Sequence, residues 1–152
     1  NFAARHHPFV RDRKSGYFKG NLYPYACRTV KHWPEAAEDE VGLTKSEYQQ
    51  WCDMYRIPTV HGWVNKYQPK LFIGVGLSAS DLYSRAVFGT SRPLEESRIT
   101  ASNGQVKRLL SAQNGWRKLV VIPHLTGGSH GLNSDDSIQK AGAAIKLLAS
   151  FT

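Results

Sequence analysis

KLVVIPHLTGGSHGLNS, residues 118–134, carries the strongest structural signal in the chain. It begins with an unbroken apolar run, residues 119–122, which is typical of a strand buried on both faces of a sheet. Pro123 ends that run, and a loop rich in glycine, histidine and hydroxyl residues leads to a helix that we expect to start near Ser134. Open α/β folds place ligands where such a strand ends. His124 occupies that position.

Other strands and helices alternate with this stretch along the chain. Residues 70–75 predict a second buried strand, and residues 78–88 predict a helix whose first turn matches a capping box. Residues 89–104 predict a loop, and apolar residues at helical spacing over 138–148 predict the last helix. This alternation implies an α/β fold, a three-layer α/β/α sandwich with a short, mostly parallel central sheet. We expect residues 1–152 to form a single domain.

The first half of the chain predicts one interrupted helix. Thr44 and Glu47 match a capping box, in which each side chain binds the other residue's backbone amide. Apolar residues then recur at helical spacing over 48–67, although we expect Pro58 to interrupt the helix. The acidic stretch 34–42 predicts a loop before it.

The chain is basic, and its positive charge is unevenly spread. The formal net charge is +8 and the isoelectric point is about 9.7, which favours polyanionic partners. The excess is concentrated in residues 5–31, where one acid, Asp12, faces seven basic residues: Arg5, Arg11, Arg13, Lys14, Lys19, Arg28 and Lys31. We expect this segment to form a DNA-binding surface, and a solvated basic surface is the alternative.

Two cysteines and the lack of long apolar runs set the expected environment. Cys27 and Cys52 are too few for a disulfide framework, a four-thiolate iron–sulfur cluster or a zinc site built on CxxC pairs. No other spacing suggests a metal site, so we expect no metal and no cofactor. No run approaches the length of a membrane span. We therefore expect a cytoplasmic protein with reduced thiols and no membrane partner.

Residues 74–79, GVGLSA, match the GxGxxA pattern between a strand and a helix. One interpretation is a dinucleotide-binding turn, in which glycines let a pyrophosphate approach the helix N-terminus. The other is a tight turn whose glycines allow close packing. The first needs an acid at the end of the next strand, but Glu95 and Glu96 follow a segment that does not read as a strand. A dinucleotide-dependent enzyme is therefore the weakest functional hypothesis.

The loop after residues 119–122 has the residue types of an anion-binding site. His124 either donates a hydrogen bond to charge that develops on a leaving group or is satisfied by backbone groups. His130 is either a second functional group or a surface residue. The hydroxyls and glycine amides suited to an anion nest are Thr126, Gly127, Gly128 and Ser129.

These segments together resemble the uracil-DNA glycosylase superfamily. Residues 20–28, GNLYPYACR, are similar to the strand whose asparagine reads a flipped base, with a Cys-Arg pair just beyond it. Residues 68–77, QPKLFIGVGL, resemble its Arg-Pro-Lys, apolar strand and glycine segment. Residues 121–129, VIPHLTGGS, resemble its second motif, a strand that ends in histidine before a loop of small residues. The resemblance covers most of residues 20–150.

The resemblance implies a DNA glycosylase-like hydrolase, which flips a base out of the duplex and removes it without a metal. Asn21 would hydrogen-bond the base edge, and His124 would stabilise charge on the departing base. The basic surface 5–31 would face the DNA. The loop and one arginine would contact DNA and its phosphates: Leu125, Thr126, Gly127, Gly128, Ser129, His130 and Arg28.

The chain departs from the family in two places. The family's water-activating motif precedes the asparagine strand, and neither Gly-Gln-Asp-Pro nor Gly-Glu-Ala-Pro occurs here. Either the sequence begins after that strand, or the protein lacks the strand and its chemistry. Gly127 and Gly128 replace the family's proline or intercalating leucine, so a wedge must come from Leu125 or Leu132, or be absent. A catalytically inactive module of this fold, binding a nucleic acid or nucleotide, is the alternative function.

Overall fold

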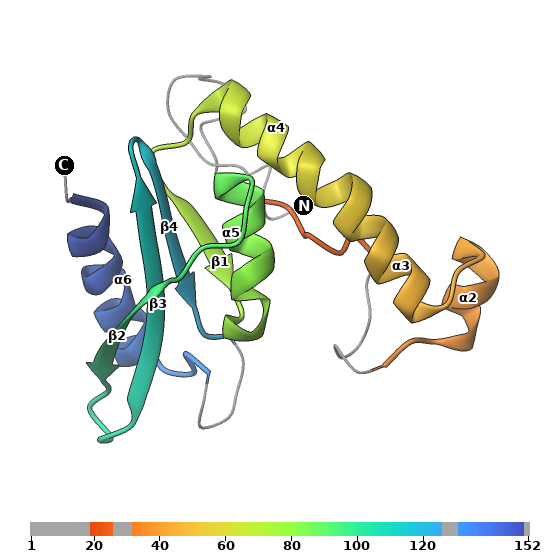
Figure 1. Ribbon diagram of the computed structural model, residues 1–152. Helices are drawn as coiled ribbons and strands as arrows, with labels where there is room; N and C mark the ends of the chain where they lie inside the picture. Colours follow the sequence, from red (N-terminus) through yellow and green to blue (C-terminus); the bar gives the residue numbers. More distant parts are fainter. Residues whose placement is uncertain (1–18, 26–31, 126–130, 151–152) are drawn as a thin grey trace, which may run out of the picture.

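A computed structural model describes residues 19–25, 32–125 and 131–150 (Figure 1). A four-stranded sheet has helices packed on it, and a long helical arm leads away from it to α2. The elements, in chain order, are α2 (Glu35–Val41), α3 (Lys45–Trp51), the π-helix η2 (Cys52–Arg56), α4 (Ile57–Tyr67), β1 (Phe72–Val75), the 3₁₀-helix η3 (Leu77–Ala79), α5 (Ser80–Phe88), β2 (Glu95–Thr100), β3 (Val106–Asn114), β4 (Arg117–Ile122) and α6 (Asp135–Ser150).

The sheet has the strand order β1-β4-β3-β2. The α/β class is confirmed, but the expectation of a mostly parallel sheet is wrong. Only β1 and β4 pair in parallel, whereas β4 with β3 and β3 with β2 are antiparallel. The reason is local, because β3 and β4 are joined by a tight turn in which Gly115 has φ 57°. A turn this short can join only antiparallel neighbours.

Strand β2 corrects the expectation of a loop over residues 89–104. Its residues alternate between exposed and partly buried, and Ile99 packs against the cluster beneath α6. The outward Glu96 carboxylate pairs with Arg98 at 2.7 Å and with Arg108 of β3 at 2.8 Å. Strand β2 lies at the edge of the sheet, where one large apolar side chain is enough, and this left little hydrophobic signal in the sequence.

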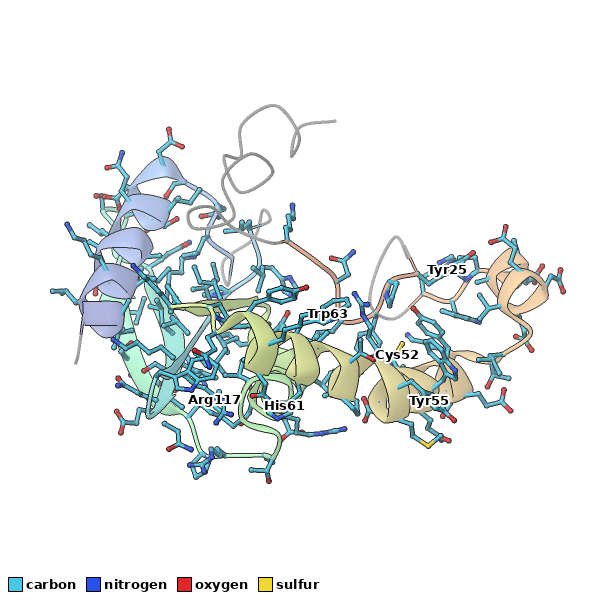
Figure 2. The ribbon with its side chains drawn as sticks, turned by 90° about the horizontal axis from the view of Figure 1, so that it is seen from above. Tyr25, Cys52, Tyr55, His61, Trp63 and Arg117 are labelled. Carbon is cyan, nitrogen blue, oxygen red and sulfur yellow. The ribbon has the colours of Figure 1, made fainter. Side chains whose placement is uncertain are left out.

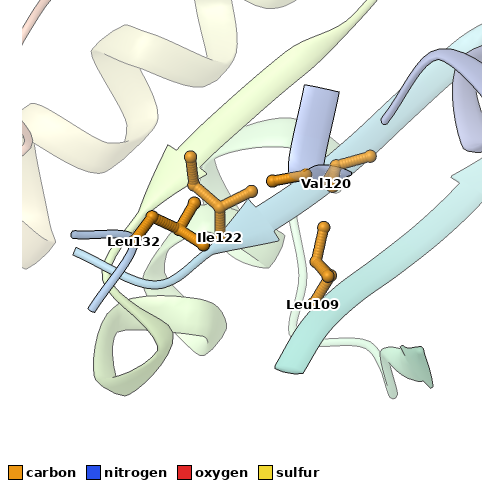
Figure 3. Close-up of a cluster of buried hydrophobic side chains, with 5 residues drawn as sticks. Leu109, Val120, Ile122 and Leu132 are labelled. Carbon is orange, nitrogen blue, oxygen red and sulfur yellow. The ribbon is translucent and has the colours of Figure 1, made fainter. Parts of the chain in front are cut away.

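The core lies on both faces of β4. Leu119 and Val121 pack with Val87 and Phe88 of α5 on one face. The alternate residues of β4 pack on the other face, beneath α6 (Figure 3). That second cluster of buried side chains consists of Leu109, Val120, Ile122, Leu132 and Ala141. Residues 119–122 are all buried, which confirms the expected strand with two buried faces.

The arm is one continuous helix, so the interruption expected at Pro58 is wrong. The Ile57 amide donates to the Cys52 carbonyl, which is the wider π-helical bond of η2. Pro58 then falls in the first turn of α4, where its missing N–H is tolerated. The capping box at the start of the arm is confirmed, since Thr44 N donates to Glu47 Oε2 at 2.8 Å.

Two further expectations about helix starts and loops are wrong. The acidic stretch 34–42 contains helix α2, because its alanines and glutamates favour a helix and its first-turn acids complement the helix dipole. The capping box expected in residues 78–88 is absent, because η3 precedes α5 and the Asp81 carboxylate accepts instead from the Ser91 hydroxyl. Within the described parts of the chain, no helix has the length and apolarity needed to cross a membrane.

A chain of hydrogen bonds fastens the arm to the sheet. Arg117 Nη2 of β4 donates to Asn65 Oδ1 at 2.8 Å, and the Asn65 amide donates to His61 Nε2 at 3.0 Å. His61 Nδ1 in turn donates to the Ala86 carbonyl of α5 at 3.2 Å. His61 and Arg117 both lie at the sheet end of the arm (Figure 2). This chain requires the His61 tautomer with its proton on Nδ1.

Candidate functional site

The candidate site lies where the parallel pair of strands ends. Val75 and Ile122 are register partners, and the Gly76 amide continues the ladder by donating to the Ile122 carbonyl at 2.8 Å. The chain then passes His124, whose carbonyl accepts from the Leu132 amide at 2.9 Å. The two ends of the intervening loop are therefore held together at the carboxyl edge of β1 and β4, where α/β folds bind ligands.

The imidazole of His124 is seated on the backbone of Gly76. A Cβ on Gly76 would lie 2.6 Å from Cε1 and 2.7 Å from Nε2 of that ring. Gly76 also has φ 107°, which side-chain-bearing residues rarely adopt. His124 is nevertheless exposed, and among the described residues neither of its ring nitrogens has a hydrogen-bond partner. The Cε1 and Nε2 atoms of the ring thus lie closest to Gly76, just beyond the end of β1.

The GVGLSA glycines make room for the protein's own aromatic rings. A Cβ on Gly74 would lie 2.4 Å from Cδ2 of Tyr83, and the space beside Gly76 is filled by His124. The Tyr83 hydroxyl donates to the Val75 carbonyl at 2.7 Å, and burial raises the pKa of this phenol. In a dinucleotide site these glycines would face the cofactor's pyrophosphate. The geometry therefore favours the close-packing interpretation of the motif.

Asn21 lies beside the helical arm. Its side chain is exposed, and its carbonyl accepts from Arg56 Nη2 at 3.2 Å. The Arg56 guanidinium lies 5.0 Å from the ring centre of Trp63, which is labelled on the arm in Figure 2. Residues 21–25 form bends, so the strand anticipated around Asn21 is not found among the described residues.

The segment around Asn21 packs near the start of β1, because Leu22 and Phe72, the first residue of β1, both pack against the buried cluster of Ile57, Val60 and Ala86. His124 packs beyond the last residue of β1. No hydrogen bond within the described ranges joins the two residues. Both residues are exposed.

Of the remaining predicted site residues, Leu125 is described. Its side chain is 57% exposed next to His124, whereas Leu132 is 2% exposed and belongs to the core beneath α6. Leu132 is therefore ruled out as a wedge, which leaves Leu125 or no wedge at all. The other predicted positions lie outside the described residues: Arg28, Lys31, Thr126, Gly127, Gly128, Ser129, His130 and the basic residues before Lys19.

A partly buried carboxylate, Asp53, was missed by the reasoning from sequence. Asp53 Oδ2 pairs with Arg85 Nη1 at 3.1 Å, while its Oδ1 is buried and has no hydrogen-bond partner among the described residues. Burial, and then the nearby Asp53 charge, raise the pKa of Tyr23, two residues from Asn21. An acidic residue within an amphipathic helix gives no sequence signal that it will be partly buried and paired with a distant arginine. The structure thus places a carboxylate on the Asn21 side of the molecule.

The described residues form no metal site, and the two grooves that they line do not include the predicted site residues. Among the described residues, no three side chains of the His, Cys, Asp and Glu types are grouped closely enough to hold a metal ion. Cys52 is a free, buried thiol, and burial raises its pKa. Two grooves are lined by described residues, one at the amino ends of β1 and β4 and one on the arm, and neither includes His124 or Asn21.

Comparisons with known proteins leave the family open. No protein-family model matches the chain, and no curated protein or solved structure matches it.

Proposed function

We propose that this chain is a DNA glycosylase-like domain that hydrolyses the N-glycosidic bond of a flipped, damaged or modified base. The proposal includes the three-layer α/β/α sandwich of the uracil-DNA glycosylase superfamily, and the packing of α5 and α6 on opposite faces of β4 supports it. It also includes DNA as the partner, for which the net charge of +8 is the support, and a reduced cytoplasmic setting.

The position and restricted orientation of the His124 imidazole are the main support for the proposal. The imidazole is exposed at the carboxyl end of the parallel pair, and its orientation is restricted by Gly76. When the bond between sugar and base breaks, negative charge develops on the departing base. A positioned N–H donor that meets such charge contributes about 3 kcal/mol, or roughly a hundredfold in rate. His124 is the described residue best placed to supply it.

Asn21 and Leu125 have supporting roles in this proposal. The Asn21 amide offers one donor and one acceptor direction to a base edge, and Arg56 holds its backbone in place. Leu125, beside His124, is the apolar side chain available to enter the base stack when a nucleotide is flipped out.

A nucleic-acid-binding module without catalysis is the second candidate. One observation favours it, since no carboxylate or amide side chain among the described residues is hydrogen-bonded to the His124 imidazole. Asp53, the carboxylate on the Asn21 side, is already paired with Arg85.

A base-release assay on the full chain separates the two candidates. Single- and double-stranded oligonucleotides would carry one uracil, hypoxanthine or 3-methyladenine, with an unmodified oligonucleotide as control. We expect release of a free base, detected by mass spectrometry, and DNA affinity that falls steeply as salt rises. Salt-dependent binding without release would establish the binding module. If the chain neither releases a base nor binds DNA, both candidates are contradicted.

A further inference from the structure

The far end of the arm contains an apolar groove whose lining includes neither His124 nor Asn21. Its volume is about 520 Å³, within the range of ligand-binding clefts, and its lining residues are Pro24, Tyr25, Val41, Leu43, Tyr48 and Trp51. The Tyr25 amide donates to the Tyr48 hydroxyl at 2.8 Å, which ties the loop wall of the groove to α3. Trp33 supports both tyrosines, with ring centres 5.3 Å from Tyr25 and 5.1 Å from Tyr48.

Large apolar side chains are exposed beside this groove. Trp51, Met54 and Tyr55 are 46%, 64% and 55% exposed, and the Trp51 and Tyr55 ring centres lie 5.6 Å apart. Trp51 lines the groove and also contacts Tyr55, so the groove continues into the exposed apolar side chains of Met54 and Tyr55. Figure 2 shows Tyr25 and Tyr55 on opposite sides of the arm. Exposed apolar side chains that gather in one patch often mark an interaction surface.

The segment that contributes Val41 and Leu43 to the groove has a charge opposite to that of the chain as a whole. Five of the 12 acidic residues lie between positions 35 and 47, where Lys45 is the only basic residue: Glu35, Glu38, Asp39, Glu40 and Glu47. All five are exposed. Among the described residues, no ion pair involves Glu35, Glu38 or Asp39. Of these five acids, which we call the acidic rim, Glu40 contacts the groove, because its carboxylate accepts from the Tyr25 hydroxyl at 3.0 Å. Acidic groups beside an aromatic groove repel phosphates and attract cationic groups.

We propose that the groove and its acidic rim dock an extended, basic segment of a partner protein, in which proline or another apolar side chain alternates with lysine or arginine. Grooves lined by aromatic rings bind extended, proline-containing peptides, because such peptides lose little entropy on binding. The apolar side chains enter beside Tyr48 and Trp51, while the cationic side chains meet Glu38 and Asp39. The arm holds this surface away from the sheet, so its occupant leaves His124 accessible (Figure 1). This proposal does not depend on the glycosylase hypothesis.

Selection from a library of random 12-residue peptides displayed on phage tests the proposal, with the full chain as bait. The recovered peptides are expected to combine lysine or arginine with proline, leucine or an aromatic residue. Recovery of acidic peptides, or no enrichment at all, would overturn the proposal. If the chain itself dimerises and Trp51→Ala abolishes the dimer, a second copy is the occupant and the proposal is wrong.

Binding of the best recovered peptide, measured by fluorescence anisotropy, then locates the surface. Trp51→Ala should weaken binding about tenfold or more, as the loss of a central aromatic anchor does. Trp116→Ala is the matched control, because Trp116 is similarly exposed at 40% but lies on the β3–β4 turn. Glu38→Lys should weaken binding several-fold more than Glu95→Lys, which makes the same charge change on β2. Equal effects within either pair would place the peptide elsewhere and overturn the proposal.

Discussion

The imidazole of His124 fills the space where a side chain on Gly76 would lie, since a Cβ built there would be 2.7 Å from Nε2. Gly76, which begins the turn after β1, thereby orients His124, which lies just beyond β4. Because the strands pair in parallel, their ends meet at one edge of the sheet and this contact becomes possible. The orientation of His124 is thus a property of the strand pairing and of the glycine together.

Substitution Gly76→Ala should destabilise the protein by about 2–4 kcal/mol, because it combines a left-handed backbone with a steric clash. In a His124→Ala background the clash is gone, so the cost should fall to the backbone contribution of about 1–2 kcal/mol. Urea unfolding of the four proteins in this double-mutant cycle measures both values. Gly142→Ala is the control, because nothing lies within 4 Å of its Cβ and alanine favours the helix. Additive effects in the cycle would contradict the contact.

The start of the arm should show a defined pH dependence. Hydrogen bonds from the Thr44 hydroxyl and then its backbone amide lower the pKa of Glu47. A carboxylate whose folded pKa lies below its unfolded value of about 4.3 stabilises the protein fully above that value. The stabilisation is lost as the pH falls through the folded pKa. The difference in stability between wild type and Glu47→Gln should therefore shrink on acidification below about pH 4.3. A difference independent of pH would contradict the capping box.

Arg56 should control the order of the segment that carries Asn21. Its Nη2 donates to the Asn21 carbonyl, and a hydrogen bond from a charged donor contributes about 1.5 kcal/mol, or roughly tenfold in protection against exchange. Arg56→Ala should lower amide hydrogen-exchange protection in residues 19–25 by about that factor. Arg98→Ala, which removes a 69% exposed guanidinium from β2, should leave the segment unchanged. Equal protection in both variants would show that Arg56 does not hold the segment.

An element of the fold could be predicted only where its own residues form a recognisable hydrophobic or turn pattern. Residues 119–122 form an unbroken apolar run and were recognised as a buried strand. Strand β2 has one large apolar residue, Ile99, and was missed. Gly115, at the first position of the two-residue loop between β3 and β4, is a hairpin signal that would have indicated the antiparallel pairing of β4 with β3. The π-turn before Pro58 depends on the continuity of a packed helix, which no local pattern shows.

The candidate site was predictable in part for the same reason. His124 was identified because the end of a buried strand is visible in the sequence. Its contact with Gly76 and the Arg56 bond to Asn21 join residues far apart along the chain, so neither could be read from local spacing. Asp53 and Arg85 pair between the arm and α5 and gave no local pattern either.

His124→Ala on the full chain separates catalysis from binding at the carboxyl edge of β1 and β4. Single-turnover base release and DNA affinity would be measured on the same oligonucleotide. If the imidazole stabilises the departing base, release should fall about a hundredfold while affinity changes less than about twofold. An equal loss of both would make His124 a binding residue, and unchanged release would remove it from the chemistry.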